Sequence, residues 1–187
     1  AASDVYKRQG PARAPPRDLT QAQATYETWI HADPAAPEPY DRLDMVLQAR
    51  GALQARVDLW RRLTEQHGDW PRPHLFLGHA RRGVGDLAGA VEAYRHASEL
   101  AAKDPGLRLT YANALADHGD TAEAIAVLRA SQNFAEHTPL LRFRLIELLC
   151  ETGAVDEARQ YANEWRAQGH TLPDAVAEAL SAADTSH

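Results

Sequence analysis

Residues 71–104 decide the fold and read PRPHLFLGHARRGVGDLAGAVEAYRHASELAAKD. The stretch begins with Pro71, and Gly85 follows 14 residues later. Proline suits the first turn of a helix, because an N–H there would lack an intrahelical partner anyway. Glycine suits the turn that ends a helix, because it adopts positive φ without steric cost. The stretch is therefore predicted to form a helix, a turn and a second helix.

The same punctuation recurs along the chain at a spacing of 34 residues. Proline stands at Pro37, Pro71, Pro105, Pro139 and Pro173, and glycine stands 14 residues after the first four of these, at Gly51, Gly85, Gly119 and Gly153. First helices are predicted at residues 38–50, 72–84, 106–118 and 140–152, and second helices at 54–67, 88–101, 122–134 and 156–168. Apolar residues at three-residue steps, such as Val57, Trp60 and Leu63, favour helices, and no stretch alternates as a strand does.

The details of this unit are similar to a known family. The matching residues are Leu77-Gly78-His79-Ala80, Gly85-Asp86-Leu87, Ala90, Tyr94 and Ala97. They resemble the consensus of the tetratricopeptide repeat (TPR) family. The resemblance implies an all-α fold, a right-handed α–α superhelix in which antiparallel helix hairpins stack as a solenoid.

The 34-residue spacing divides the chain into segments. These are a disordered or artefactual N-terminal segment and linker at 1–17, the second helix of a truncated repeat at 18–36, repeats at 37–70, 71–104, 105–138 and 139–172, and a capping helix with a tail at 173–187.

One unit departs from the family pattern. In the family, a small residue of the first helix faces an alanine of the second, as Gly78 and Ala90 would here. In the unit at 37–70 this pair is Asp44 and Arg56, and we hypothesise that their charges meet across the hairpin. The alternative is a register shifted by one residue, in which Ala55 takes the packing position.

Composition restricts the functional classes. The net charge of −6 argues against a nucleic-acid partner, and no apolar run approaches the roughly 18 residues that membrane insertion needs. No phosphate-binding loop or paired metal-ligand motif occurs, so no catalytic residue, cofactor or metal is predicted, and the chain is not expected to be an enzyme. The single cysteine, Cys150, is predicted to be buried. A cytoplasmic location is favoured, and a periplasmic one stays open because we expect the true N-terminus to be missing.

The resemblance implies a function in protein binding. The chain would be a bacterial-type interaction scaffold that holds a peptide or protein segment in a concave groove lined by the first helices. The predicted groove residues are Met45, Leu75, His79, Arg82, Leu109, Asn113, Phe143 and Glu147. Leu75, Leu109 and Phe143 form an apolar row, which could instead pack inside the array. Arg82 and Asn113 would orient the ligand, although Arg82 could equally be a solvated charge.

Two other functions remain open at this point. The chain could be a regulatory or substrate-positioning fragment of a larger bacterial enzyme, such as a sulfotransferase or glycosyltransferase. Weak self-association is expected if Val176, Ala179 and Leu180 leave the last hairpin partly uncovered.

Overall fold

The computed structural model describes residues 18–34, 36, 38–131 and 139–185. These residues form helices and no strand. The helices are α1 (Leu19–Ala32), α2 (Glu38–Ala49), α3 (Leu53–Gln66), α4 (Pro71–Gly83), α5 (Leu87–Leu100), α6 (Pro105–His118), α7 (Thr121–Ala130), α8 (Pro139–Glu151), α9 (Val155–Ala167) and α10 (Asp174–Thr185). The predicted all-α fold class is confirmed.

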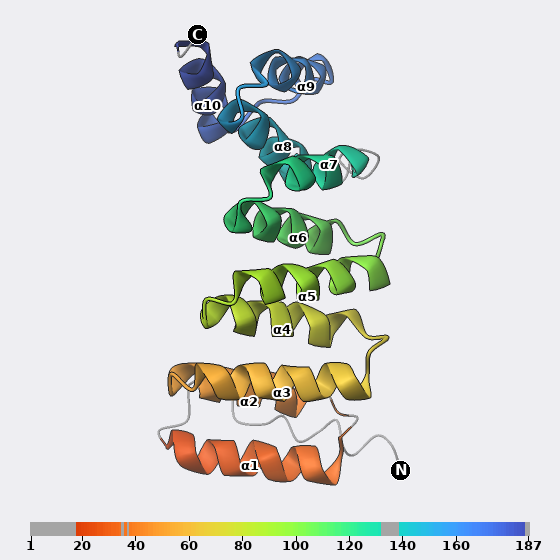
Figure 1. Cartoon of the computed structure of the whole chain (residues 1–187), viewed down its shortest axis with the longest axis vertical. Coiled ribbons are helices and arrows are strands. Elements are labelled where there is room, and N and C mark those ends of the chain that lie inside the picture. The colour runs from red at the N-terminus through yellow and green to blue at the C-terminus, as the bar shows by residue number, and fades with distance from the viewer. Residues whose placement is uncertain (1–17, 35, 37, 132–138, 186–187) are drawn as a thin grey trace. The chain divides into compact units, whose positions relative to one another are not determined.

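The chain divides within α3 into two compact units, residues 1–59 and 60–187. In the first unit, α1 packs against α2. In the second unit, each helix from α4 to α9 packs against the next, and α10 packs against both α8 and α9 (Figure 1).

Proline and glycine mark the helix ends as predicted. Pro71, Pro105 and Pro139 are the first residues of α4, α6 and α8. The glycines that follow the first helices all have positive φ: 67° at Gly51, 82° at Gly85, 102° at Gly119 and 78° at Gly153. The segment at 1–17 lies outside the described residues, and the assignment of repeat boundaries stays a prediction.

A close contact holds the hairpin of α4 and α5 together. Gly78 is buried on α4, and a Cβ atom placed there would lie 2.6 Å from Cδ1 of Tyr94 on α5. Ala90 and Tyr94 are each 1 % exposed. The ring of Tyr94 therefore fills the space that the missing side chain of Gly78 leaves.

In the first unit, the predicted pairing of Asp44 with Arg56 is confirmed. Nε of Arg56 donates to Oδ1 of Asp44 over 2.8 Å, and Nη2 donates to Oδ2 over 2.9 Å. Both residues are buried. A two-point, charge-assisted contact thus replaces the small pair of the α4–α5 hairpin.

The core of the second unit is densest at α8. Its side chains Leu141, Leu145, Ile146, Leu148 and Leu149 are all 0 % exposed. Cys150 is only half-buried at the edge of this core, so the prediction of a buried thiol is met in part. Val176 and Leu180 of α10 are buried, so these two side chains do cover the end of the core. None of the described helices is long and apolar enough to cross a membrane.

Candidate functional site

The eight predicted groove residues fall in both units. Met45 lies on α2 in the first unit and is 61 % exposed. The other seven lie on α4, α6 and α8 in the second unit. Because these seven share one unit, distances and contacts are described only among them.

The apolar row consists of Leu75, Leu109 and Phe143, one residue from each of α4, α6 and α8. All three are half-buried and pack against the same core cluster. The ring of Phe143 meets the ring of Trp165 edge to face, with their centroids 5.5 Å apart. Each residue thus contributes part of its side chain to the core and keeps part at the surface.

His79 is exposed on α4 and is held by Tyr94. The Oη atom of Tyr94 lies 2.8 Å from Nδ1 of His79. Burial raises the pKa of Tyr94 to about 12, so its hydroxyl keeps its proton at neutral pH. The hydroxyl can then donate to Nδ1 of the imidazole that carries its proton on Nε2.

Arg82 and Asn113 both have partners within the protein. Nη2 of Arg82 on α4 lies 3.0 Å from Oδ2 of Asp117 on α6. Nε of Arg144 on α8 donates to Oδ1 of Asn113 on α6 over 2.9 Å. Asn113 and Asp117 are four residues apart on α6 and so share one face of the helix. Helix α6 is therefore joined through polar side chains to α4 on one side and to α8 on the other.

Arg144 connects two of the predicted residues, and the sequence analysis missed it. Besides Asn113 it binds Glu147, whose Oε2 accepts from Nη1 over 3.0 Å. A longer contact of 3.4 Å joins Nη1 to Glu151. The signal in the sequence was its position three residues before Glu147, which places both side chains on one face of α8. We call Arg82, Asp117, Asn113, Arg144 and Glu147 the polar ladder.

The polar ladder offers hydrogen bonds and compensated charges. Its members are exposed or half-buried, so each ion pair contributes little to stability. The part of the chain that the structure describes contains no group of three or more His, Cys, Asp or Glu residues that could hold a metal ion. The arrangement suits recognition of another polar chain, since it exposes donors and acceptors beside an apolar row.

A second set of residues shares one position in each predicted repeat, three residues after the proline, and also went unnoticed. Tyr40 donates from Oη to the carbonyl of Pro34 over 3.0 Å. Nε2 of His74 lies 3.0 Å from the carbonyl oxygen of Gly68. Arg108 donates from Nη2 and Nε to the carbonyl of Ala102 over 2.7 and 2.9 Å. In each case the acceptor lies six residues earlier, so these side chains close the turn before their helix.

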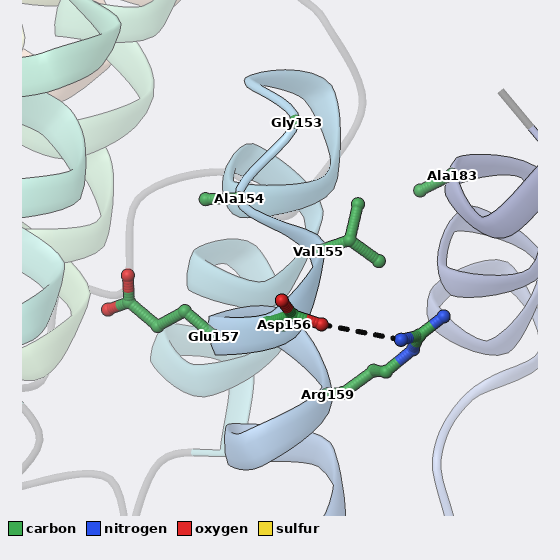
Figure 2. Close-up of a pocket in the computed structure, with 7 residues that line it drawn as sticks. All are labelled: Gly153, Ala154, Val155, Asp156, Glu157, Arg159 and Ala183. Atoms are coloured by element: carbon green, nitrogen blue, oxygen red, sulfur yellow. Dashed lines mark hydrogen bonds and ion pairs between the residues drawn. The ribbon is translucent and has the colours of Figure 1, made fainter. Parts of the chain in front are cut away.

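A shallow hollow of about 490 Å³ lies where the turn between α8 and α9 approaches α10. Figure 2 shows Asp156 and Arg159 directed toward each other, with Oδ1 and Nη1 3.4 Å apart. Glu157 is bound instead by Arg129, at 2.8 and 2.6 Å. The lining contains none of the predicted groove residues, so we do not assign it a function.

Comparison with known proteins gives a sequence match and several structural matches. The family model of the tetratricopeptide repeat matches residues 82–140. The sequence matches no curated protein. Among solved structures, MamA has a TM-score of 0.64 at 17 % identity, with 77 % of this chain and 84 % of MamA covered.

Two further structures have the same fold. The TPR protein TTC0263 of Thermus thermophilus has a TM-score of 0.56 at 21 % identity, with 88 % of this chain and 90 % of that protein covered. YrrB, described as a TPR protein with an unusual peptide-binding site, has a TM-score of 0.59 at 14 % identity, with 88 % and 77 % covered. At these identities the structural similarity establishes the fold, and the family match adds sequence support over 82–140. The chain therefore has the fold of tetratricopeptide-repeat proteins, and its sequence is similar to that family over residues 82–140.

Proposed function

We propose that the chain is a protein-interaction scaffold that binds a peptide or protein segment on the face formed by α4, α6 and α8. The observation that carries the proposal is the side-by-side occurrence of the apolar row and the polar ladder on these three helices. The fold supports it, because stacked helix hairpins present the same face of successive helices to a partner. The peptide-binding site named for YrrB is consistent with this use of the fold.

The two sets of residues would have different tasks. The half-buried side chains of Leu75, Leu109 and Phe143 are anchored in the core, so an apolar ligand side chain could cover them without a large loss of their own conformational entropy. The amide oxygen of Asn113 is already engaged by Arg144, whereas its amide nitrogen has no hydrogen-bond partner among the described residues. That nitrogen could donate to a backbone carbonyl of the ligand and so fix its position. Met45 stays a prediction from the sequence alone.

The test begins with selection of a ligand from a peptide display library on the immobilised full chain. The selected peptide is synthesised, and its affinity is measured by isothermal titration calorimetry. The double variant Arg82→Ala with Asn113→Ala should bind about tenfold more weakly or worse, because it loses the orienting groups.

A matched control is Arg129→Ala with Glu157→Ala. This double variant also removes an interhelical polar pair, but on α7 and α9. It should keep wild-type affinity, and circular dichroism should show equal helicity in all three proteins. Unchanged affinity in the first variant, or an equal loss in the control, would refute the assignment to α4, α6 and α8.

A further inference from the structure

The imidazole of His74 on α4 is held by one nitrogen and leaves the other available. Its Nε2 atom lies 3.0 Å from the carbonyl oxygen of Gly68. A carbonyl only accepts, so the proton of the neutral ring is on Nε2 and the lone pair is on Nδ1. Among the described residues, none donates a hydrogen bond to this Nδ1. Histidines that bind metal ions commonly have this arrangement, with one N–H given to a carbonyl or carboxylate and the other nitrogen on the metal.

The ring of His96 on α5 lies beside that of His74. Their centroids are 5.6 Å apart and their planes are inclined by 39°. Oε2 of Glu99 lies 3.7 Å from Nδ1 of His96. This distance is longer than a hydrogen bond, but the negative charge on that side of the ring favours a proton on Nδ1 and a lone pair on Nε2. The side chain of His96 is 51 % exposed, so an ion can reach it from water.

The spacing of the two rings suits a shared metal ion. Two imidazoles bound to one zinc ion, with each nitrogen about 2.0–2.1 Å from the metal and a tetrahedral angle between them, have their ring centres about 5 Å apart. The separation of 5.6 Å between His74 and His96 is close to this value, and the exposed side chain of His96 can turn to adjust it. Imidazole nitrogen is a preferred ligand of zinc, copper and nickel ions.

The packing of the hairpin holds the two histidines in place. They are far apart in the sequence and lie on different helices, so the sequence analysis predicted no metal. The contact of Gly78 with the buried ring of Tyr94 fixes α4 against α5 between them. The equivalent positions of the other predicted repeats, 3 and 25 residues after the proline, hold no pair of histidines. They hold Tyr40 and Arg62, Arg108 and Ala130, and Arg142 and Glu164.

We propose that Nδ1 of His74 and Nε2 of His96 bind a divalent zinc ion that joins α4 to α5. The described residues provide no third His, Cys, Asp or Glu ligand, so water completes the coordination shell and the affinity is micromolar. Gly68 and Glu99 orient the two rings from behind. The site includes no residue of the apolar row or the polar ladder, so it stands or falls independently of the proposed function.

Isothermal titration calorimetry of the full chain with zinc chloride tests this, at about pH 7.5, where an unperturbed imidazole is mostly neutral. The wild type should bind one zinc ion. His96→Gln, a change at an exposed position, should weaken binding about tenfold or more. His74→Gln and the double variant should show the same loss as His96→Gln, because one remaining histidine cannot chelate the ion. Circular dichroism should show equal helicity in all four proteins.

The matched control removes two histidines that do not face each other. His118 lies near Asp120, and His170 stacks on Trp165, and both histidines are exposed. His118→Gln with His170→Gln should keep the wild-type affinity for zinc. Magnesium chloride should neither bind nor displace zinc, because magnesium prefers oxygen ligands. An equal loss in this control, or displacement by magnesium, would assign the bound ion to other groups and overturn the proposal.

Nuclear magnetic resonance of the wild type labelled with ¹⁵N-histidine identifies the ligand atoms and does not depend on a folded variant at position 74. Long-range ¹H–¹⁵N spectra should show His74 with its proton on Nε2 before zinc is added. With zinc, Nδ1 of His74 and Nε2 of His96 should shift together along one saturating curve. Zinc should also raise the melting temperature of the wild type by about 2–4 °C at ten times the dissociation constant. Shifts at other histidines in place of these two would refute the site.

Discussion

Asp44 and Arg56 occupy the positions that Gly78 and Ala90 hold in the hairpin of α4 and α5. Two buried charges in contact stabilise a fold weakly as a pair, but the loss of one leaves the other buried and unpaired. Asp44→Ala or Arg56→Ala alone should therefore lower the free energy of unfolding of their unit by about 3–5 kcal/mol. The double variant should cost less than either single variant. Urea denaturation followed by circular dichroism measures all three, and additive losses would contradict the explanation.

At Gly78 the prediction concerns the addition of a side chain rather than the removal of one. Alanine is the better helix former, by about 1 kcal/mol, yet its Cβ would overlap the buried ring of Tyr94. Gly78→Ala should therefore destabilise the protein by about 1–3 kcal/mol. In the background of Tyr94→Leu the same substitution should cost less, because the flat ring is gone. A double-mutant cycle with no coupling between the two positions would show that the close contact is unimportant.

These residues also show what the sequence can predict. The Asp44–Arg56 pair was predictable, since two opposite charges stand where the repeat normally places two small residues. Arg144 was not, because an arginine three residues before a glutamate on a helix is common at any exposed surface. Which residue its long side chain reaches on the preceding hairpin, here Asn113, depends on how the helices pack.

At the scale of helices, the aspartates that precede α5 and α7 make different contacts. Asp86 precedes α5, and its Oδ1 accepts from the backbone N–H of Gly89 over 2.9 Å. Because Asp86 is the N-cap, the helix begins at Leu87, one residue earlier than predicted. Asp120 stands at the same repeat position before α7, but its side chain makes no capping hydrogen bond and lies 2.7 Å from Nδ1 of His118.

The two aspartates should thus respond differently to the same substitution. Asp86→Ala removes a capping acceptor and should cost about 1 kcal/mol of stability. Asp120→Ala removes none and should cost clearly less. Chemical denaturation of both variants at neutral pH gives the comparison, and equal losses would mean that the observed capping geometry does not determine the stability of these helix starts.

For the molecule as a whole, the fold could largely be predicted from the 34-residue spacing, because one proline and one glycine per unit determine where helices start and end. The division of the chain into two compact units within α3 could not be predicted, since α3 has the same apolar stripe as the other second helices. The partial burial of Leu75, Leu109 and Phe143 was equally hidden. Periodicity states which face a side chain occupies, but not how far the neighbouring helices cover it.

The free energy of unfolding at high pH should depend on the ionisation of the two buried tyrosines of the second unit. Burial raises the pKa of Tyr94 to about 12, and burial together with the hydrogen bond to Glu123 raises the pKa of Tyr111 to about 12. In the unfolded chain both phenols ionise near pH 10. The unfolded state therefore loses these protons first, so stability stays level below about pH 10 and falls between about pH 10 and 12, by about 1.4 kcal/mol per pH unit for each tyrosine.

Urea denaturation at a series of pH values measures this slope. The variant carrying Tyr94→Phe and Tyr111→Phe should show a much shallower decline, although its stability at neutral pH differs from that of the wild type. An equally steep decline in this variant would assign the loss to other groups.

The burial of α8 has a consequence for motion. Five of its side chains are completely shielded from water, whereas the only buried residue of α1 is Ala22. Amide hydrogens exchange with deuterium when their segment opens, and segments with few buried apolar contacts open most cheaply. In a hydrogen-exchange experiment followed by mass spectrometry, peptides from α1 should take up deuterium early and peptides from α8 last. Slow exchange would thus mark α8 as the segment whose opening requires the second unit to unfold as a whole.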